Sequence, residues 1–217
     1  MDIKFLGHAG FIVEGSKRVV IDPFLTGNPS AALSADEIKD ADYVIVTHGH
    51  GDHLGDAYQI CKNTGATLVS IHEIAVDAES NGLKAEGMNR GGSIKLDGLI
   101  VHMTDAKHSS DLGHECGVVI EMDGKKVYHA GDTGLFMDMK LIGEFLKPDI
   151  AILPIGDRYT MGIESAVRAV EYIGAGKVIP MHYNTFPIIE VDPMEFKAKV
   201  GNRAEVFILN PGESTKL

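Results

Sequence analysis

The chain has 217 residues, of which 44% are hydrophobic and 24% are charged, and this balance predicts one globular domain over residues 1–217. The formal net charge is −11 at pH 7, so the surface repels phosphate backbones, which argues against a nucleic-acid partner. No apolar run approaches the roughly 18 residues of a membrane span, and the first residues lack a secretory pattern. Because the only thiols are Cys61 and Cys116, we expect a cytoplasmic protein.

Short apolar runs bounded by glycine predict a chain rich in β-strands. The turns "EGSK" at 14–17 and "MDGK" at 122–125 predict two hairpins. The expected strands cover residues 2–6, 11–14, 18–21, 43–46, 67–71, 93–96, 99–104, 117–121, 126–130, 149–153, 177–181 and 205–209.

Helical periodicity predicts helices over residues 54–61, 71–79, 137–146 and 163–173. The third helix would place Met137, Leu141, Phe145 and Leu146 on one apolar face and would end before Pro148. The fourth would end at Gly174, which suits a left-handed cap.

The pattern repeats once along the chain. "FIVEGSKRVVIDPFLTG" (11–27) is similar to "GVVIEMDGKKVYHAGDTG" (117–134), and each is a hairpin that ends in an aspartate and a glycine-rich loop. Each is followed by a strand that starts after an aspartate, "DYVIVTHGH" (42–50) or "DIAILPIGD" (149–157). Two similar halves predict an α/β fold with two sheets packed face to face and helices outside.

Three histidines and an aspartate gather in "THGHGDH" at 47–53, directly after the apolar run "DYVIV". Such a loop at the end of a buried strand is a common place for a site. Gly49 and Gly51 are expected to let it turn sharply. Imidazoles and carboxylates suit zinc or manganese, and also iron or nickel. Two ions fit these four side chains better than one, with His48 and His50 on one ion and Asp52 and His53 on the other. The alternative is a loop of solvated histidines, which would not need this spacing.

"HGHGDH", followed by Gly55, resembles the signature of the metallo-β-lactamase superfamily, whose fold is a four-layer αββα sandwich. The resemblance runs through nearly the whole chain, since "VVIDP", "KHSS", "HAGDTG" and "IPMHYN" match further motifs in the same order. It implies one metal held by His48, His50 and His108 and another held by Asp52, His53 and His182. Asp132 would lie between the two ions, and Asp22 would hold the ligand loop by hydrogen bonds.

The resemblance leaves several polar residues to be judged separately. His72 and His102 are expected to have ordinary structural or surface roles. His114 competes with His108 for the third ligand position, and "HSS" favours His108. His129 could equally support the ligands or pack in the core. The expected substrate contacts are His8, Arg158 and Asn184; for Arg158, a plain surface position is an equal alternative.

Flanking segments such as "IDPFLTGNP", "LPIGDRYTMG" and "VIPMHYNTFP" look like a small family of metal-dependent hydrolases related to ascorbate-6-phosphate lactonase. The chain departs from that family at Arg158-Tyr159, where Asn-Phe is usual, and at Ile163, where proline is usual. The resemblance implies that two cations activate water against a small ester, lactone or phosphoester. Asp52 would accept or return a proton.

Other functions fit parts of the same pattern. A non-catalytic metal-binding module and a nuclease-like phosphodiesterase would both use such ligands, although the charge opposes a nucleic-acid substrate. A redox di-iron protein is disfavoured because that branch of the superfamily has a glutamate at the position of His50. A small molecule is therefore the expected partner, and the sequence is compatible with a homo-oligomer.

Overall fold

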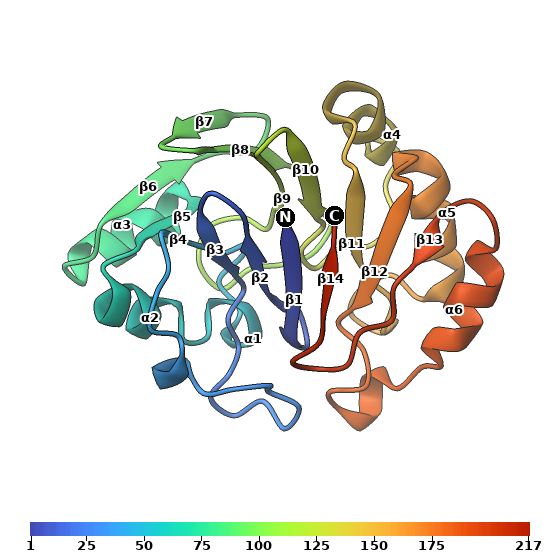
Figure 1. Cartoon of the computed structure of the whole chain (residues 1–217), viewed down its shortest axis with the longest axis horizontal. Helices are drawn as coiled ribbons and strands as arrows, with labels where there is room; N and C mark the ends of the chain where they lie inside the picture. The colour runs from blue at the N-terminus through green and yellow to red at the C-terminus, as the bar shows by residue number, and fades with distance from the viewer.

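The computed structural model describes all 217 residues and contains two seven-stranded sheets (Figure 1). The strands of the first sheet are, in spatial order, β14 (Ser214–Lys216), β1 (Asp2–Gly7), β2 (Gly10–Glu14), β3 (Arg18–Ile21), β4 (Tyr43–Ile45), β5 (Thr67–Ile71) and β6 (Ala85–Met88). Those of the second sheet are β13 (Glu205–Val206), β12 (Lys177–Met181), β11 (Ile150–Pro154), β10 (Lys125–His129), β9 (Gly117–Met122), β8 (Leu99–Thr104) and β7 (Ser93–Leu96).

The strand directions confirm the internal repeat. β1, β2 and β3 pair antiparallel, and β3 to β6 continue as parallel neighbours. In the second sheet β8, β9 and β10 are antiparallel, and β10 to β13 are parallel. Each half therefore begins with hairpins and ends with crossover units, as the repeated motifs predict.

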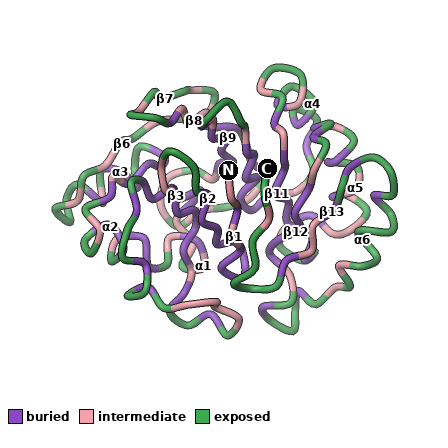
Figure 2. The backbone as a smooth tube through the Cα atoms, in the orientation of Figure 1, coloured by how far each residue is buried: buried purple, intermediate pink, exposed green.

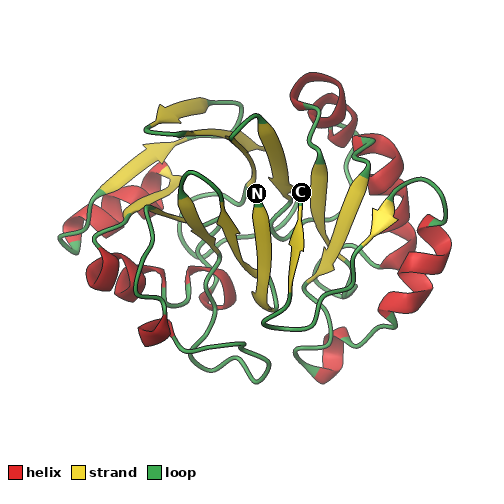
Figure 3. Cartoon of the chain, viewed as in Figure 1, coloured by secondary structure: helices red, strands yellow, loops and turns green.

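Helices lie on the outer sides of both sheets, which confirms the expected four-layer αββα arrangement (Figures 1 and 3). On one flank are α1 (Gly51–Leu54), α2 (Ala57–Thr64), α3 (His72–Ser80) and the 3₁₀ turn Ala35–Glu37. On the other are α4 (Met139–Leu141), α5 (Ile163–Ile173), α6 (Pro193–Val200) and the 3₁₀ turn Pro187–Ile189. None of these helices is both long enough and apolar enough to cross a membrane.

The central strands are buried on both faces, which explains their continuous apolar runs (Figure 2). In β11, Ile150 and Ile152 belong to the core between the sheets, whereas Ala151 and Leu153 pack into the core beneath the outer helices. Strand periodicity of two thus distributes one apolar run between two cores.

The expected helix over 54–61 is instead two helices that break at Gly55, whose φ is +39°. A Cβ at this position would lie 2.5 Å from the Pro23 carbonyl oxygen. The loop that contains Asp22 therefore packs directly against this break, and only glycine allows the approach.

The predicted apolar face of the helix over 137–146 is not buried in the core, although the helical segment ends at Leu146, before Pro148, as expected. The helical segment begins at Met139 and continues as a π-helical turn, Ile142–Leu146. Met139 and Ile142 are buried, whereas the Met137 and Phe145 side chains are 61% and 76% exposed. The π turn changes the periodicity, so a regular helical repeat assigns the wrong residues to the core.

Helix α6 and the edge strands β6 and β14 were not predicted. Asp192 caps α6 by accepting a hydrogen bond from the Met194 amide at 2.8 Å, but only Phe196 and Val200 of the helix are buried. The two edge strands, "AEGM" and "STK", have no buried residue. Their pairing comes from backbone hydrogen bonds, which leave no apolar pattern in the sequence.

Candidate metal centre

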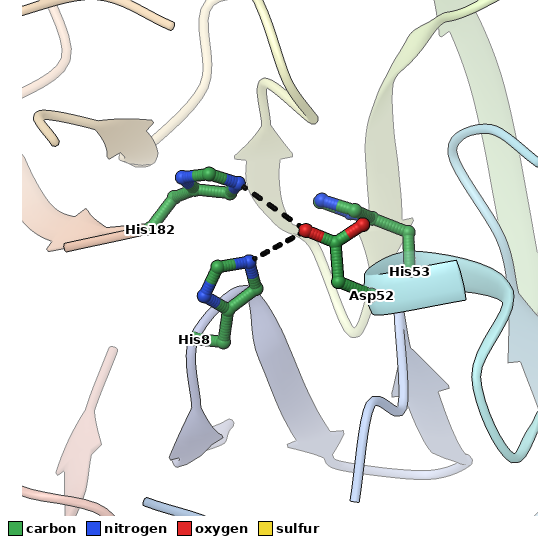
Figure 4. Close-up of side chains that lie close together, drawn as sticks. All are labelled: His8, Asp52, His53 and His182. Atoms are coloured by element: carbon green, nitrogen blue, oxygen red, sulfur yellow. Dashed lines mark hydrogen bonds and ion pairs between the residues drawn. The ribbon is translucent and has the colours of Figure 1, made fainter. Parts of the chain in front are cut away.

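Loops at the ends of five strands meet at one edge of the two sheets. The 47–53 segment follows β4, and the β1–β2 turn carries His8. The β8–β9 loop carries His108, Asp132 follows β10, and His182 follows β12. Residues 174 positions apart in sequence, such as His8 and His182, thus become neighbours, with ring centroids 4.0 Å apart (Figure 4).

One group of possible ligands consists of His48, His50 and His108, whose ring nitrogens lie within 4.8 Å of one another. The His48 Nε2 to His50 Nδ1 distance is 2.9 Å. Burial, aided by the neighbouring His53, lowers the pKa of His48 to about 3, so this ring is neutral at pH 7. Burial likewise lowers the pKa of His108. Neutral rings offer the lone pairs that a cation requires.

A second group consists of Asp52, His53, His182 and His8, again within 4.8 Å of one another (Figure 4). Burial opposes the ionisation of Asp52, but the His182 ring, 3.8 Å away, and the hydrogen bond from His8 outweigh it and lower its pKa. Burial also opposes protonation of His182, yet the Asp132 carboxylate raises its pKa to about 9. Without a cation, protons therefore supply the positive charge of this group.

Asp132 lies between the two groups and is almost fully buried. One carboxylate oxygen, Oδ1, is 3.2 Å from His53 Nε2. The other, Oδ2, is 3.0 Å from His182 Nε2 and 3.5 Å from His108 Nε2. Burial opposes its ionisation, but His53 and His182 hold its pKa well below the usual range. This one carboxylate therefore faces side chains of both groups.

The buried atoms at this centre lack the hydrogen-bond partners that a folded protein normally provides. His53 Nε2, Asp132 Oδ1 and His182 Nε2 are inaccessible to solvent and make no hydrogen bond. An unpaired buried polar atom costs about 1–3 kcal/mol. These nitrogen and oxygen atoms converge, and they are the donors that zinc or manganese binds, so the residues present fit divalent cations.

Asp22 orients His53 from the side away from the centre. Its Oδ2 is 2.7 Å from His53 Nδ1 and accepts a 2.6 Å hydrogen bond from the Thr47 hydroxyl, while Oδ1 accepts from the Thr47 amide at 2.8 Å. A carboxylate only accepts, so His53 keeps a proton on Nδ1, and Nε2, which faces Asp132, is the nitrogen that a cation can take once it displaces the second proton. The part played by Thr47 was missed, although it directly precedes His48.

Gly49 has a role other than the sharp turn expected of it, because its φ is not positive. A Cβ there would lie 2.7 Å from the Leu112 amide nitrogen. The Gly49 amide also donates a 3.0 Å hydrogen bond to Ser110 Oγ. The absence of a side chain therefore lets the 47–53 loop pack against the loop that carries His108. Gly51 meets no such constraint.

The remaining histidines lie elsewhere. His129 is fully buried and makes no hydrogen bond to a ligand candidate; its Nε2 is 2.9 Å from the Ala9 carbonyl oxygen, and its Nδ1 accepts from the Gly131 amide. It thereby links the β1–β2 turn to the loop of Asp132. His114 is exposed and outside both groups. His102 pairs with Ser93 on the neighbouring strand at 2.7 Å.

A cavity of about 360 Å³ opens over the centre and is lined by His50, Asp52, His108, Ser109, Asp132, Tyr159 and His182. Of the expected substrate contacts, Arg158 is exposed and lies outside this lining. Asn184 is also outside, and its Oδ1 accepts from the Val191 amide at 2.8 Å. His8 is buried behind Asp52. Tyr159, 53% exposed, lines the cavity in place of its neighbour Arg158 and was not predicted.

Comparison with known proteins agrees with this geometry. A family model described as a beta-lactamase superfamily domain matches residues 17–183. A "UPF0173 metal-dependent hydrolase" of Pelotomaculum thermopropionicum is 53% identical and covers 100% of both chains. One of Archaeoglobus fulgidus is 50% identical over 99% of this chain and 98% of the relative.

The solved structure of Igni18, a metallo hydrolase from the archaeon Ignicoccus hospitalis, superposes with a TM-score of 0.94 at 46% identity. It covers 99% of this chain and 97% of its own. With ligand-type residues converging at the loop edge of an αββα sandwich, and with these relatives matching from end to end, the chain belongs to the metallo-β-lactamase superfamily and is a metal-dependent hydrolase.

Proposed function

We propose that the protein hydrolyses a small ester, lactone or phosphoester with the help of two divalent cations. His48, His50 and His108 would hold one cation, Asp52, His53 and His182 would hold the other, and Asp132 would contact both. The observation that carries this proposal is the position of Asp132, within 3.5 Å of ring nitrogens from both groups. A single-ion site would not need a buried carboxylate between two sets of ligands.

When bound, the cations would supply Lewis acidity, which lowers the pKa of water and polarises a carbonyl or phosphoryl oxygen. Zinc and manganese suit the donors best, and iron or nickel would also bind imidazole and carboxylate. Among the protein groups, the Asp52 carboxylate lies at the cavity wall, where it is placed to accept a proton from water and return it to a leaving group. Ser109 and Tyr159 also line the cavity and offer hydroxyl groups to a bound substrate.

The cavity lining contains no lysine or arginine. A phosphomonoester carries about two negative charges at pH 7 and is usually held by such side chains. The lining therefore leaves the charge of a phosphoryl group to the two cations alone, and we propose an ester or lactone in preference to a phosphomonoester.

Metal analysis followed by a substrate panel tests this function. The panel contains a γ-lactone, an aryl ester, a phosphodiester and a phosphomonoester. We expect hydrolysis of the lactone or ester that stops when a chelator removes the metal. Asp132→Ala should lose most of this hydrolysis. Asp105→Ala, which alters a half-exposed carboxylate that pairs with Arg90, is its control. Full metal occupancy with no hydrolysis of any member would instead favour a non-catalytic metal-binding module.

A further inference from the structure

His8 has a backbone conformation that few residues other than glycine adopt. It lies in the tight β1–β2 turn with a φ of +59°, after Gly7 with a φ of +108°. A Cβ on Gly7 would meet the Ser30 carbonyl oxygen at 2.7 Å, so the chain cannot relax easily there. Residues held in the left-handed region persist only where their surroundings determine them, and such residues gather at functional sites.

This turn contacts the two loops that carry the second group of ligands. The His8 side chain reaches Asp52 Oδ2 through Nε2 at 3.1 Å and Thr185 Oγ1 through Nδ1 at 2.8 Å. Its carbonyl oxygen accepts a 2.7 Å hydrogen bond from the His182 amide. The turn is itself anchored from behind, because His129 lies 2.9 Å from the Ala9 carbonyl oxygen.

Counting hydrogens fixes the role of each ring nitrogen. A neutral imidazole has one donor and one acceptor, and a carboxylate can only accept. Nε2 must therefore carry the proton and donate it to Asp52. Nδ1 is left as the acceptor, so the Thr185 hydroxyl donates to it. Both His8 nitrogens are thus engaged by protein atoms, whereas His53 Nε2 and His182 Nε2 are buried without a hydrogen-bond partner, although His8 lies as close to the centre as they do.

We propose that His8 is a positioning residue, held by Thr185, that fixes Asp52 and His182 for one cation and is not itself a ligand. This inference rests on the proposed two-cation function. Phe24 and Phe186 approach the His8 ring edge-on at 5.7 and 5.8 Å and leave it little freedom to turn. Partners of this kind typically contribute about 10- to 100-fold to metal affinity.

Cobalt titration of the metal-free protein separates a positioning residue from a ligand, because the visible spectrum of bound Co²⁺ reports the number and type of its ligands. We expect the native chain to bind two Co²⁺ ions. His8→Ala should lower the affinity for the Co²⁺ ion held by Asp52, His53 and His182 about 10- to 100-fold. The spectrum of that ion at saturation should stay unchanged. Thr185→Val, similar in shape but without the hydroxyl, should also lower the affinity for this ion. Thr185→Ser, which keeps the hydroxyl, should restore it. Thermal unfolding of each metal-free variant checks that the fold is kept.

Three results would overturn the inference. A changed Co²⁺ spectrum at saturation in His8→Ala would make His8 a ligand. Native affinity in both His8→Ala and Thr185→Val would leave it no role at the metal. Binding of fewer than two ions by the native chain would refute the two-cation function and this inference with it. The first two results would leave the two-cation function intact.

Discussion

Replacement of Asp22 by asparagine should disable His53 without removing a ligand. Asp22 has a φ of +44°, a conformation that asparagine tolerates, so the backbone is not strained further. Because Oδ1 accepts from the Thr47 amide, the new NH₂ group must take the place of Oδ2. There it faces His53 Nδ1 as a donor, so the His53 proton moves to Nε2, the atom that points at Asp132.

The magnitude follows from the hydrogen bond that is lost. With a cation on Nε2, the His53 Nδ1–H and the new amide N–H face each other as unpaired buried donors, at a cost of about 1–3 kcal/mol. Since about 1.4 kcal/mol is a factor of ten, the affinity for one of the two cations should fall roughly 5- to 150-fold. The other cation, whose proposed ligands touch Asp22 only through the Thr47 hydroxyl, should be less affected.

Competition between the metal-free variant and a chromophoric chelator for Zn²⁺ measures this loss. Asp56→Asn is a matched control, because Asp56 is also a buried carboxylate that accepts from two amides, those of Leu25 and Thr26, but contacts no histidine. Two Zn²⁺ sites of native affinity in Asp22→Asn, or an equal loss in Asp56→Asn, would refute the tautomer argument.

Three further predictions concern activity, folding and pH. Asp132→Ala should lower hydrolysis by roughly 100-fold or more while circular dichroism shows the fold retained, and a cooperative loss of structure would mean a structural metal site. Gly131→Ala should lower the free energy of unfolding, because φ there is +61° and a Cβ would lie 2.5 Å from the Cys116 carbonyl oxygen; urea denaturation measures it, and native stability would contradict the strain. The pKa of His182 in the metal-free protein is raised to about 9. Its contribution to the stability of that metal-free form is therefore complete below about pH 6.5 and is lost as the pH rises through 9. The pKa of His48 is lowered to about 3, so its contribution is present above about pH 6.5 and is lost on acidification. Urea denaturation across pH should therefore show maximal stability near pH 6.5, and a monotonic profile would contradict these shifts.

The sequence predicted the layers because the central strands must bury both faces. Runs such as the one in β11 can satisfy two cores only inside a covered sheet, and the repeated hairpins set the strand directions. Elements without fully buried side chains gave no such pattern. Strands β6 and β14 lie at sheet edges and bury no residue completely, although Ala85 and Met88 of β6 pack partly against the core. The π turn after α4 shifts which residues face inward.

For the site, the sequence predicted the ligands that are close together in the chain but not the contacts between distant residues. The close spacing of His48, His50, Asp52 and His53 indicates convergence, since one loop carries all four. The contact between His8 and Asp52 joins residues 44 positions apart, and the one with Thr185 spans 177 positions. No local pattern contains such contacts, because they depend on how the two sheets are packed. For the same reason the sequence did not distinguish Tyr159, which lines the cavity, from its exposed neighbour Arg158.

Anomalous diffraction at the zinc edge from crystals of the zinc-loaded protein tests the central claim most directly. The two-cation account predicts two peaks per chain. One should lie about 2.0–2.2 Å from ring nitrogens of His48, His50 and His108, and the other at the same distance from atoms of Asp52, His53 and His182. A single peak, or peaks away from these atoms, would contradict it.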